Sequence, residues 1–334
     1  MSLIRYEVGA SASVAAIAPI GMEPRQPSGN ELLVRIEASS LNNHDFLVVN
    51  GAIATVPGRV PLSDGVGIVE ACGPDVTAYS LGDRVMGTFF PDWSRGSVYA
   101  EGVARMRGDH VDGFAASYVT MAESDFTRSP ANLGALAAAC LPCAGLTAWR
   151  ALFVEGELQP GQTVLVQGSG GVSLFALQFA RAAGARVIAT TGKPENVERL
   201  LALGAHAVVD RHDPDWGKAV RKASDGGVDQ VVEIAGGDLA QSLQSLRTGG
   251  RLTLVGVLSR KSIQIAPQLL IHGNRRISGV TVGSREQQEA MVAAVEENRI
   301  VPVIDVTFPL TQLREAFERF SQQQHFGKIA ISCE

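Results

Sequence analysis

Short apolar runs alternate with helix-length segments through the second half of the chain. This alternation is typical of a parallel sheet covered by helices. Two of the predicted helical segments are 172–184 and 194–205. Gly184 and Gly204 stand at the ends of these segments, where glycine favours a helix C-terminus. The predicted strands cover residues 163–168, 185–191, 207–210, 228–236, 251–258 and 275–283.

The first part of the chain has a different pattern, in which strand-like runs are separated by Gly, Pro, Asn and Asp. These runs, 31–41, 65–73, 83–90 and 117–124, predict a mostly β domain. After residue 284 the pattern predicts two helices, 286–298 and 311–324, and then a strand, 327–333. A closing strand after two helices favours a return to the first domain, with the helix-covered sheet inserted between the two parts.

Length and charge narrow the class of protein. At 334 residues the chain exceeds the size at which one hydrophobic core usually suffices, so we expect two domains. The 29 basic and 34 acidic side chains give a net charge of -5 without a dense basic run, which argues against nucleic acid or an anionic membrane as partner. The N-terminus lacks a secretory-signal pattern, and no window approaches the ~20 consecutive apolar residues of a membrane span. We expect a cytoplasmic protein that acts on a small molecule.

Glycines stand between an apolar strand and an amphipathic helix in the segment VLVQGSGGVSLFALQFA. Such glycines allow a tight turn, and the free amides and dipole at the helix start attract a pyrophosphate. Ser173 replaces the Gly or Ala that normally permits close packing of this helix on the strand. A glycine-rich turn without a ligand is the plain alternative, whereas a hydrolase elbow at Ser169 would need glycine where Gln167 stands. The expected dinucleotide contacts are Gly168, Ser169, Gly170, Gly171 and Val172.

The end of the second predicted strand distinguishes the two nicotinamide cofactors. An enzyme that prefers NAD usually carries an acidic side chain there, about twenty residues after the first glycine. This strand instead ends with Thr190 and Thr191, followed by Gly192 and Lys193, and Arg211 follows the third strand. These side chains favour a 2'-phosphate and therefore NADPH, unless the two cations are ordinary solvated charges.

The chain resembles the medium-chain dehydrogenase/reductase superfamily across essentially its whole length. The segments VPLSDGVGIVEACGPDVTAYSLGDRVMGTFFPDW, LPCAGLTAWRAL, VLVQGSGGVSLFALQFARAAGARVIATT and HFGKIAI carry this resemblance. It implies an α/β fold in which a Rossmann doubly wound parallel sheet is inserted into a GroES-like, mostly β domain. The expected boundaries are 1–128 for the GroES-like catalytic domain, 129–280 for the Rossmann domain and 281–334 for the returning segment. The resemblance also implies a homodimer and an active site in the cleft between the domains.

The zinc-binding branch of this superfamily provides three ligand positions that can be matched to this chain. Asn42 stands at the first position, Ser63 at the second, and only Cys143 retains a family ligand, with Asp64 at the family glutamate. Amide and hydroxyl oxygens bind zinc weakly beside sulfur or imidazole. Although Asp64 and His44 could join Cys143 around a metal, we expect no metal, and the resemblance then points to the zinc-independent quinone oxidoreductase-like branch. Cys143 is expected to be a small thiol that lines the nicotinamide pocket.

The remaining candidates follow from the same resemblance and from residue chemistry. Asn42 is a candidate donor to a substrate carbonyl or the nicotinamide ribose, and His44, a candidate general acid, stands where zinc enzymes place a proton relay. Asp64 is either catalytic or an acceptor of backbone hydrogen bonds. Aromatic residues suited to stacking on a flat acceptor, or to core packing, are Phe89, Phe90 and Trp93, with Tyr99 nearby. Further cofactor contacts are expected from Thr147, Gly256, Val257, Val282 and Gly283.

These features predict an NADPH-dependent, zinc-independent oxidoreductase that reduces a quinone, enone or enal. Delocalised acceptors of this kind suit a metal-free pocket, because hydrogen-bond donors and a proton source can replace a Lewis acid. An alcohol dehydrogenase or carbonyl reductase with an atypical site is the alternative within enzymes. A redox-inactive NADPH-binding protein is the alternative from another class.

Overall fold

The computed structural model describes residues 3–236, 239–256 and 265–333. The chain forms two compact units, Met1–Leu146 with Gly283–Glu334 and Thr147–Val282. The C-terminal segment therefore returns to the first unit, as its pattern predicts. This division falls later than the expected boundary after residue 128, because the segment before Leu146 packs on strands of the first unit.

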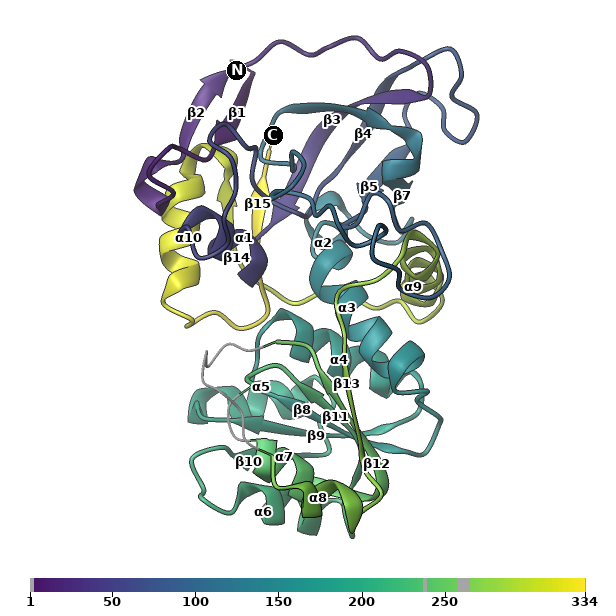
Figure 1. Ribbon diagram of the computed structural model, residues 1–334, viewed down its shortest axis with the longest axis vertical. Coiled ribbons are helices and arrows are strands. Elements are labelled where there is room, and N and C mark those ends of the chain that lie inside the picture. Colours follow the sequence, from purple (N-terminus) through teal and green to yellow (C-terminus); the bar gives the residue numbers. More distant parts are fainter. Residues whose placement is uncertain (1–2, 237–238, 257–264, 334) are drawn as a thin grey trace. The chain divides into compact units, whose positions relative to one another are not determined.

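The first unit is built on a seven-stranded sheet whose order is β14-β15-β3-β4-β5-β7, with β6 pairing β3. The closing strand β15 (Lys328–Ser332) runs antiparallel to the long, buried β3 (Glu31–Ser40), with Ala330 opposite Ser40 (Figure 1). The other strands of this sheet are β4 (Val66–Cys72), β5 (Arg84–Gly87), β6 (Tyr118–Ala122), β7 (Phe126–Arg128) and β14 (Ile304–Pro309). A separate hairpin and the helices of this unit are β1 (Ile4–Glu7), β2 (Ala18–Gly21), α1 (Asn43–Val49), α2 (Ala135–Ala138), α9 (Arg285–Glu297) and α10 (Leu313–Ser321).

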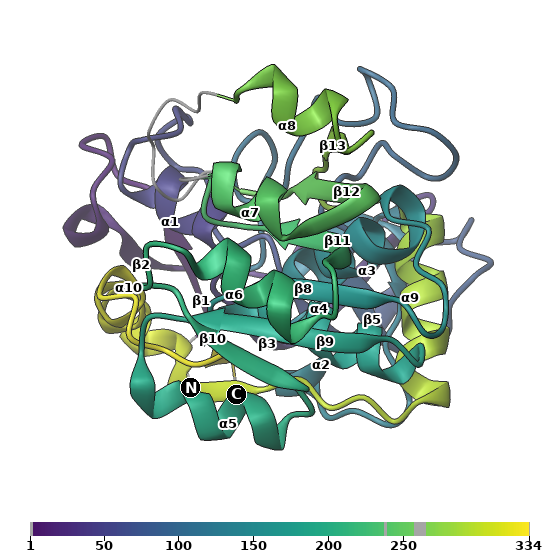
Figure 2. The same cartoon turned by 90° about the horizontal axis from the view of Figure 1, so that it is seen from below.

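The second unit contains a six-stranded parallel sheet with the order β10-β9-β8-β11-β12-β13. In chain order this is 3-2-1-4-5-6, the arrangement of a dinucleotide-binding fold, and it places the reversal of direction between β8 and β11. Figure 2 shows these strands following one another in a twisted layer. The strands are β8 (Thr163–Gln167), β9 (Arg186–Thr191), β10 (Ala207–Asp210), β11 (Val228–Glu233), β12 (Leu246–Leu254) and β13 (Arg276–Gly279). The helices are α4 (Gly171–Ala182), α5 (Val197–Ala202), α6 (Trp216–Ala223), α7 (Leu239–Ser245) and α8 (Pro267–Ile271).

The six strands predicted between residues 163 and 283 are therefore all present. Gly184 and Gly204 lie just beyond α4 and α5 with positive φ angles of 76° and 103°, which confirms their place at helix C-termini. The fold class expected from the resemblance is confirmed.

One helical segment, Ala135–Glu155, is long and apolar enough to cross a membrane by length and composition. It includes α3 (Leu146–Trp149) and two wider turns, Leu141–Gly145 and Arg150–Glu155. The sequence expectation concerned consecutive apolar residues, and this helix contains the charged residues Arg150 and Glu155. In addition, 72% of its apolar window is buried inside the protein, as in the core helix of a folded domain.

Candidate functional site

The glycine-rich turn joins β8 to α4 and leaves space beside its backbone. Gly168 has a φ of +72°, and a Cβ atom added at Gly168 or Gly170 would meet nothing within 4 Å. Helix α4 begins at Gly171, with Gly170 as an N-cap residue that has no side chain to occupy the helix amides. Open space and available amides are what a pyrophosphate needs at a helix N-terminus, so these residues fit a dinucleotide. Val172 lies in the first turn of the same helix.

The contacts of Ser173 show why serine can replace the usual Gly or Ala at this position of the dinucleotide-binding motif. Its side chain is 1% exposed, and its hydroxyl donates a 2.5 Å hydrogen bond to the carbonyl oxygen of Gln167 at the end of β8. The helix is thus fastened to the strand by a hydrogen bond at the position where glycine or alanine usually allows contact. Serine therefore does not weaken this part of the motif.

The ends of β9 and β10 bring the predicted cations together. Thr191 pairs with Asp210 in the parallel register, so the residues that follow each strand are neighbours. The amide of Arg211 donates to the Thr191 carbonyl oxygen at 3.0 Å, while Lys193 is half-buried and Arg211 is exposed. Sequence reasoning missed His212, whose Nε2 atom lies 3.1 Å from the carbonyl oxygen of Gly192.

The absence of a side chain at Gly192 leaves room for His212. A Cβ atom at Gly192 would lie 2.7 Å from the Nε2 atom of His212, closer than real contacts allow. Because the imidazole follows directly after Arg211, it adds a third side chain able to carry positive charge beside Lys193. The pairing of these two turns, which depends on strand order, could not be read from the sequence.

One further side chain fastens the glycine-rich loop and was also missed. Asn196 is 3% exposed, and its amide donates a 2.9 Å hydrogen bond to the Ser169 hydroxyl. This contact joins the turn after β9 to the glycine-rich loop. Ser169 is thus engaged as a hydrogen-bond acceptor within the loop.

Glu233 joins the ends of β8 and β11, beside the reversal of the sheet. Its buried carboxylate accepts hydrogen bonds from Gln167 Nε2 at 2.7 Å and Ser242 Oγ at 2.5 Å. The backbone amides of Ala235 and Gly236 also donate to it. Glu233 therefore shapes the segment that follows β11, at the edge of the sheet where a dinucleotide fold binds its ligand.

The other predicted cofactor contacts lie in both units. Gly256 follows β12 and Val282 follows β13, at the carboxyl ends predicted for them. Thr147 is 5% exposed and begins the second unit, whereas Gly283 begins the return to the first. Val257 lies outside the described residues. Contact of these residues with a cofactor remains a prediction.

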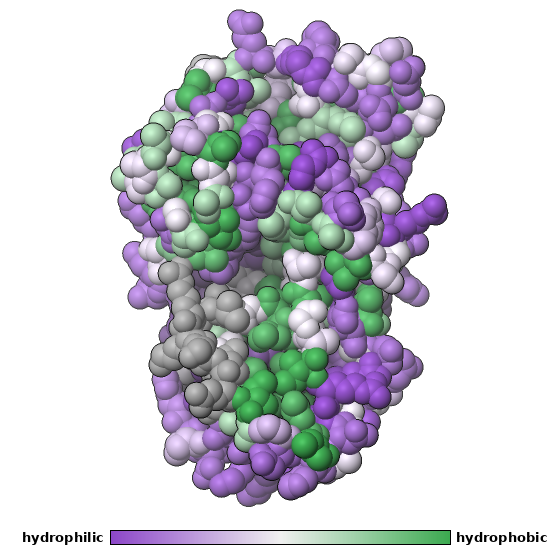
Figure 3. Space-filling view, in the orientation of Figure 1, coloured by the Kyte–Doolittle hydropathy of each residue, from purple (hydrophilic) through white to green (hydrophobic). Residues whose placement is uncertain are grey.

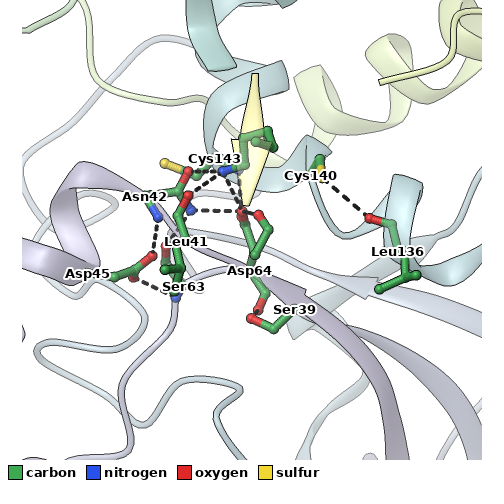
Figure 4. Close-up of polar contacts among 11 residues, drawn as sticks. Ser39, Leu41, Asn42, Asp45, Ser63, Asp64, Leu136, Cys140 and Cys143 are labelled. Carbon is green, nitrogen blue, oxygen red and sulfur yellow. Dashed lines mark hydrogen bonds and ion pairs between the residues drawn. The ribbon is translucent and has the colours of Figure 1, made fainter. Parts of the chain in front are cut away.

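A buried polar network in the first unit gathers the three positions that correspond to zinc ligands (Figure 4). Asp64, which is 0% exposed, accepts hydrogen bonds from Ser40 Oγ at 2.5 Å, Asn42 Nδ2 at 2.7 Å and the backbone amide of Cys143 at 2.9 Å. Lys328 enters the network from β15, with its Nζ atom 3.5 Å from Asp64 Oδ2. Such extensive hydrogen bonding favours the structural alternative for Asp64 over direct catalysis.

The amide of Asn42 is fully engaged in this network. Its Nδ2 atom donates to Asp64 and, at 3.3 Å, to Ser63 Oγ, while its Oδ1 atom accepts a 2.5 Å hydrogen bond from Lys328. Both amide hydrogens are thereby directed to protein acceptors. In this arrangement Asn42 has no donor left for a substrate carbonyl, which is the role that the sequence suggested.

The donor set does not fit a catalytic zinc ion. Cys143 is the one family ligand, and burial together with the Asp64 carboxylate raises the pKa of its thiol well above the usual value. Asn42 and Ser63 offer only neutral groups that already take part in hydrogen bonds. Among the described residues, no three His, Cys, Asp or Glu side chains come together as a metal site.

His44 lies on the first turn of α1, with one ring nitrogen buried and without a hydrogen-bond partner among the described residues. The imidazole is half-buried and contacts Phe89 edge-on at a centroid distance of 5.1 Å. Its Nε2 atom is buried and has no hydrogen-bond partner among the described residues. His44 Nε2 is thus not engaged by another side chain, whereas the polar side-chain atoms of Asn42 and Asp64 are, so His44 fits the predicted proton donor better than Asn42 or Asp64 does.

The aromatic candidates form a row of packed rings. Phe89 and Phe90 meet edge-on at 4.8 Å, and Phe90 and Trp93 lie 6.0 Å apart. Phe89, Phe90 and Trp93 are 3%, 2% and 0% exposed, respectively, whereas Tyr99 is 42% exposed. This burial favours core packing for Phe90 and Trp93, and contact of the three rings with a substrate remains a prediction.

Comparisons with known proteins agree with the fold. Family models match residues 28–131 as an alcohol dehydrogenase GroES-like domain and residues 171–297 as a zinc-binding dehydrogenase. A zinc-type alcohol dehydrogenase-like protein of Schizosaccharomyces pombe is 35% identical over 325 residues, 93% of each chain. Human quinone oxidoreductase is 30% identical over 303 residues, 87% of this chain and 85% of its own. The crystal structure of a putative alcohol dehydrogenase from Sinorhizobium meliloti has a TM-score of 0.91, 36% identity and 99% coverage of both chains.

Proposed function

The chain belongs to the medium-chain dehydrogenase/reductase superfamily of oxidoreductases, which bind a nicotinamide cofactor, and from this premise we propose its reaction. We propose that the protein is an NADPH-dependent, zinc-independent oxidoreductase that reduces a quinone, enone or enal. The single observation that carries the proposal is the buried network at the positions of the zinc ligands. Asn42 bonds Ser63, Asp64 and Lys328, and Asp64 also accepts a hydrogen bond from the Cys143 amide.

The second unit holds the dinucleotide. The amides at the start of α4 bind the pyrophosphate, and the open backbone at Gly168 and Gly170 permits its close approach. Lys193, Arg211 and His212 lie on the two turns that would face a 2'-phosphate. The lack of an acidic side chain at the end of β9 supports NADPH over NADH.

The first unit supplies the proton that completes the reduction. NADPH supplies the hydride, and reduction of a conjugated acceptor then requires one proton at oxygen or carbon. His44 donates this proton through its Nε2 atom, which has no hydrogen-bond partner among the described residues. Phe89 fixes the ring from the side, which limits the rotation of His44.

The name of the human relative, quinone oxidoreductase, supports this acceptor class. The Schizosaccharomyces pombe and Sinorhizobium meliloti relatives have names that indicate alcohol dehydrogenases, so an alcohol dehydrogenase or carbonyl reductase is the second candidate. The neutral donors at positions 42 and 63 count against it, because an alcohol-to-carbonyl couple benefits from a Lewis acid.

Steady-state kinetics with NADPH against quinones, enals, aldehydes and alcohols tests the proposal. We expect turnover with quinones, enones or enals that persists after dialysis against a chelator. Turnover confined to alcohols and aldehydes would favour the second candidate. Tight NADPH binding without turnover of any acceptor would favour a redox-inactive NADPH-binding protein.

We also propose that the enzyme is a cytoplasmic homodimer. Strand β13 forms one edge of the six-stranded sheet, and Ile271 in the neighbouring α8 is 72% exposed. Figure 3 shows apolar surface gathered over the part of the second unit that carries α8. A second copy of the chain would cover this edge and surface, and sedimentation equilibrium distinguishes a dimer from a monomer.

A further inference from the structure

Lys328 is a buried cation that sequence reasoning did not select. It is the first residue of β15, and its side chain is 4% exposed. Its Nζ atom donates to the Leu41 carbonyl oxygen at 2.7 Å and to Asn42 Oδ1 at 2.5 Å, and lies 3.5 Å from Asp64 Oδ2. A buried ammonium group is tolerated only when it is paired and hydrogen-bonded, so these contacts depend on one another.

The contacts of Lys328 lead directly to the helix that carries His44. Asn42 is the N-cap residue of α1, and its backbone amide donates to the Asp45 carboxylate at 2.9 Å. The carbonyl oxygen of Asn42 accepts the first hydrogen bond of the helix, from the amide of Phe46 at 3.1 Å. Because Lys328 holds the side chain of Asn42, it fixes the residue that starts this turn, and His44 is the second residue of the helix.

The same network fastens separate parts of the first unit at one buried point. Ser40 belongs to β3, Asp64 precedes β4, Cys143 lies in the helical segment, and Lys328 begins β15. The Cys143 amide is available to Asp64 because Pro142 and the wider turn interrupt the regular helix pattern. In zinc enzymes of the superfamily the three matched positions are joined by the metal, whereas here hydrogen bonds around Asp64 join them.

We propose that Lys328 is a positioning residue that orients His44 through Asn42 and the first turn of α1. This inference rests on the proposed role of His44 as proton donor. Lys328 itself does not contact the substrate, since its ammonium group is engaged with Leu41, Asn42 and Asp64.

The test compares Lys328→Met, Lys328→Arg and the double variant Lys328→Met/Asp64→Asn with the wild type. Lys222→Met, at an exposed position of α6, is the matched control for loss of a lysine. Lys328→Met leaves the Asp64 carboxylate without its cation, so the melting temperature should fall on the order of 10 °C. The double variant removes both charges and should recover most of this loss.

Turnover distinguishes positioning from stability alone. We expect Lys328→Met to lower kcat about 10- to 100-fold while the NADPH Kd changes less than about twofold, since the residues assigned to the pyrophosphate and the 2'-phosphate lie in the second unit. The double variant should regain stability but not kcat, because Asn42 Oδ1 still lacks its donor, and Lys328→Arg should restore part of kcat. Recovery of kcat together with melting temperature in the double variant would overturn the inference, as would wild-type kcat in Lys328→Met.

An NMR measurement separates failure of this inference from failure of the proposed function. The imidazole signals of His44, assigned by their loss in His44→Gln, should shift in Lys328→Met and remain unchanged in Lys222→Met. If the wild type reduces no quinone, enone or enal, the proposed function fails, yet this shift still reports whether Lys328 orients His44. Unchanged His44 signals in Lys328→Met would refute the positioning role.

Discussion

Replacing Lys193 with alanine should weaken NADPH binding and leave NADH binding nearly unchanged. Lys193 follows β9, beside the turn that carries Arg211 and His212, and the side chain is half-buried. A charge-assisted hydrogen bond at such a partly exposed site contributes on the order of 1 to 2 kcal/mol. Loss of that contribution corresponds to an increase of about 5- to 30-fold in the NADPH Kd.

Isothermal titration calorimetry with NADPH and NADH measures both affinities on the same variants. Lys222→Ala removes an exposed lysine from α6 and should change neither affinity. The wild-type preference for NADPH should also decrease as salt is added, because exposed charges are screened. Equal losses for the two cofactors in Lys193→Ala would refute the assignment, since only NADPH carries a 2'-phosphate.

Three further predictions concern proton transfer, metal content and the phosphate loop. His44→Gln should lower kcat by ~10²- to 10⁴-fold with little change in NADPH affinity; wild-type kcat in this variant would assign the proton to solvent. Protein purified without added metal should contain far less than stoichiometric zinc by elemental analysis, and the prediction is wrong if a chelator removes stoichiometric zinc together with activity. Asn196→Ala should weaken NADPH and NADH binding alike, about 5-fold, because it removes the hydrogen bond to Ser169 rather than a 2'-phosphate contact; a selective loss for NADPH would contradict this assignment.

The dinucleotide loop was predictable because its chemistry belongs to the backbone. Gly168 and Gly170 act through conformation and space, and the strand before them and the helix after them have clear hydrophobic patterns. His212 and Asn196 were not predicted, because their roles depend on how the turns after β9 and β10 lie against each other and against the loop. Strand order decides those contacts, and no local pattern encodes it.

In the first unit, the sequence predicted less of the candidate site. Comparison with zinc enzymes correctly selected Asn42, Asp64 and Cys143 as neighbours, yet it suggested substrate contacts where the structure has internal hydrogen bonds. The missing partner was Lys328, which lies 264 positions from Asp64 in the chain and is an ordinary residue at the start of a predicted strand. Burial of its ammonium group, which only the fold determines, makes it significant.

The hydrogen bonds around Asp64 also bear on which hydride acceptors the enzyme can reduce. Reduction of an isolated carbonyl concentrates negative charge on one oxygen and needs strong donors or a metal beside that oxygen. Here the Asn42 amide, the Ser40 hydroxyl and the Lys328 ammonium group already donate to protein acceptors, so recruiting them for substrate would leave the Asp64 carboxylate buried with fewer partners. A quinone or an enone spreads the developing charge over several atoms and can be completed by a single proton from His44. We therefore expect a higher kcat/KM for conjugated acceptors than for simple aldehydes, and a ratio that instead favours aldehydes would contradict this reasoning.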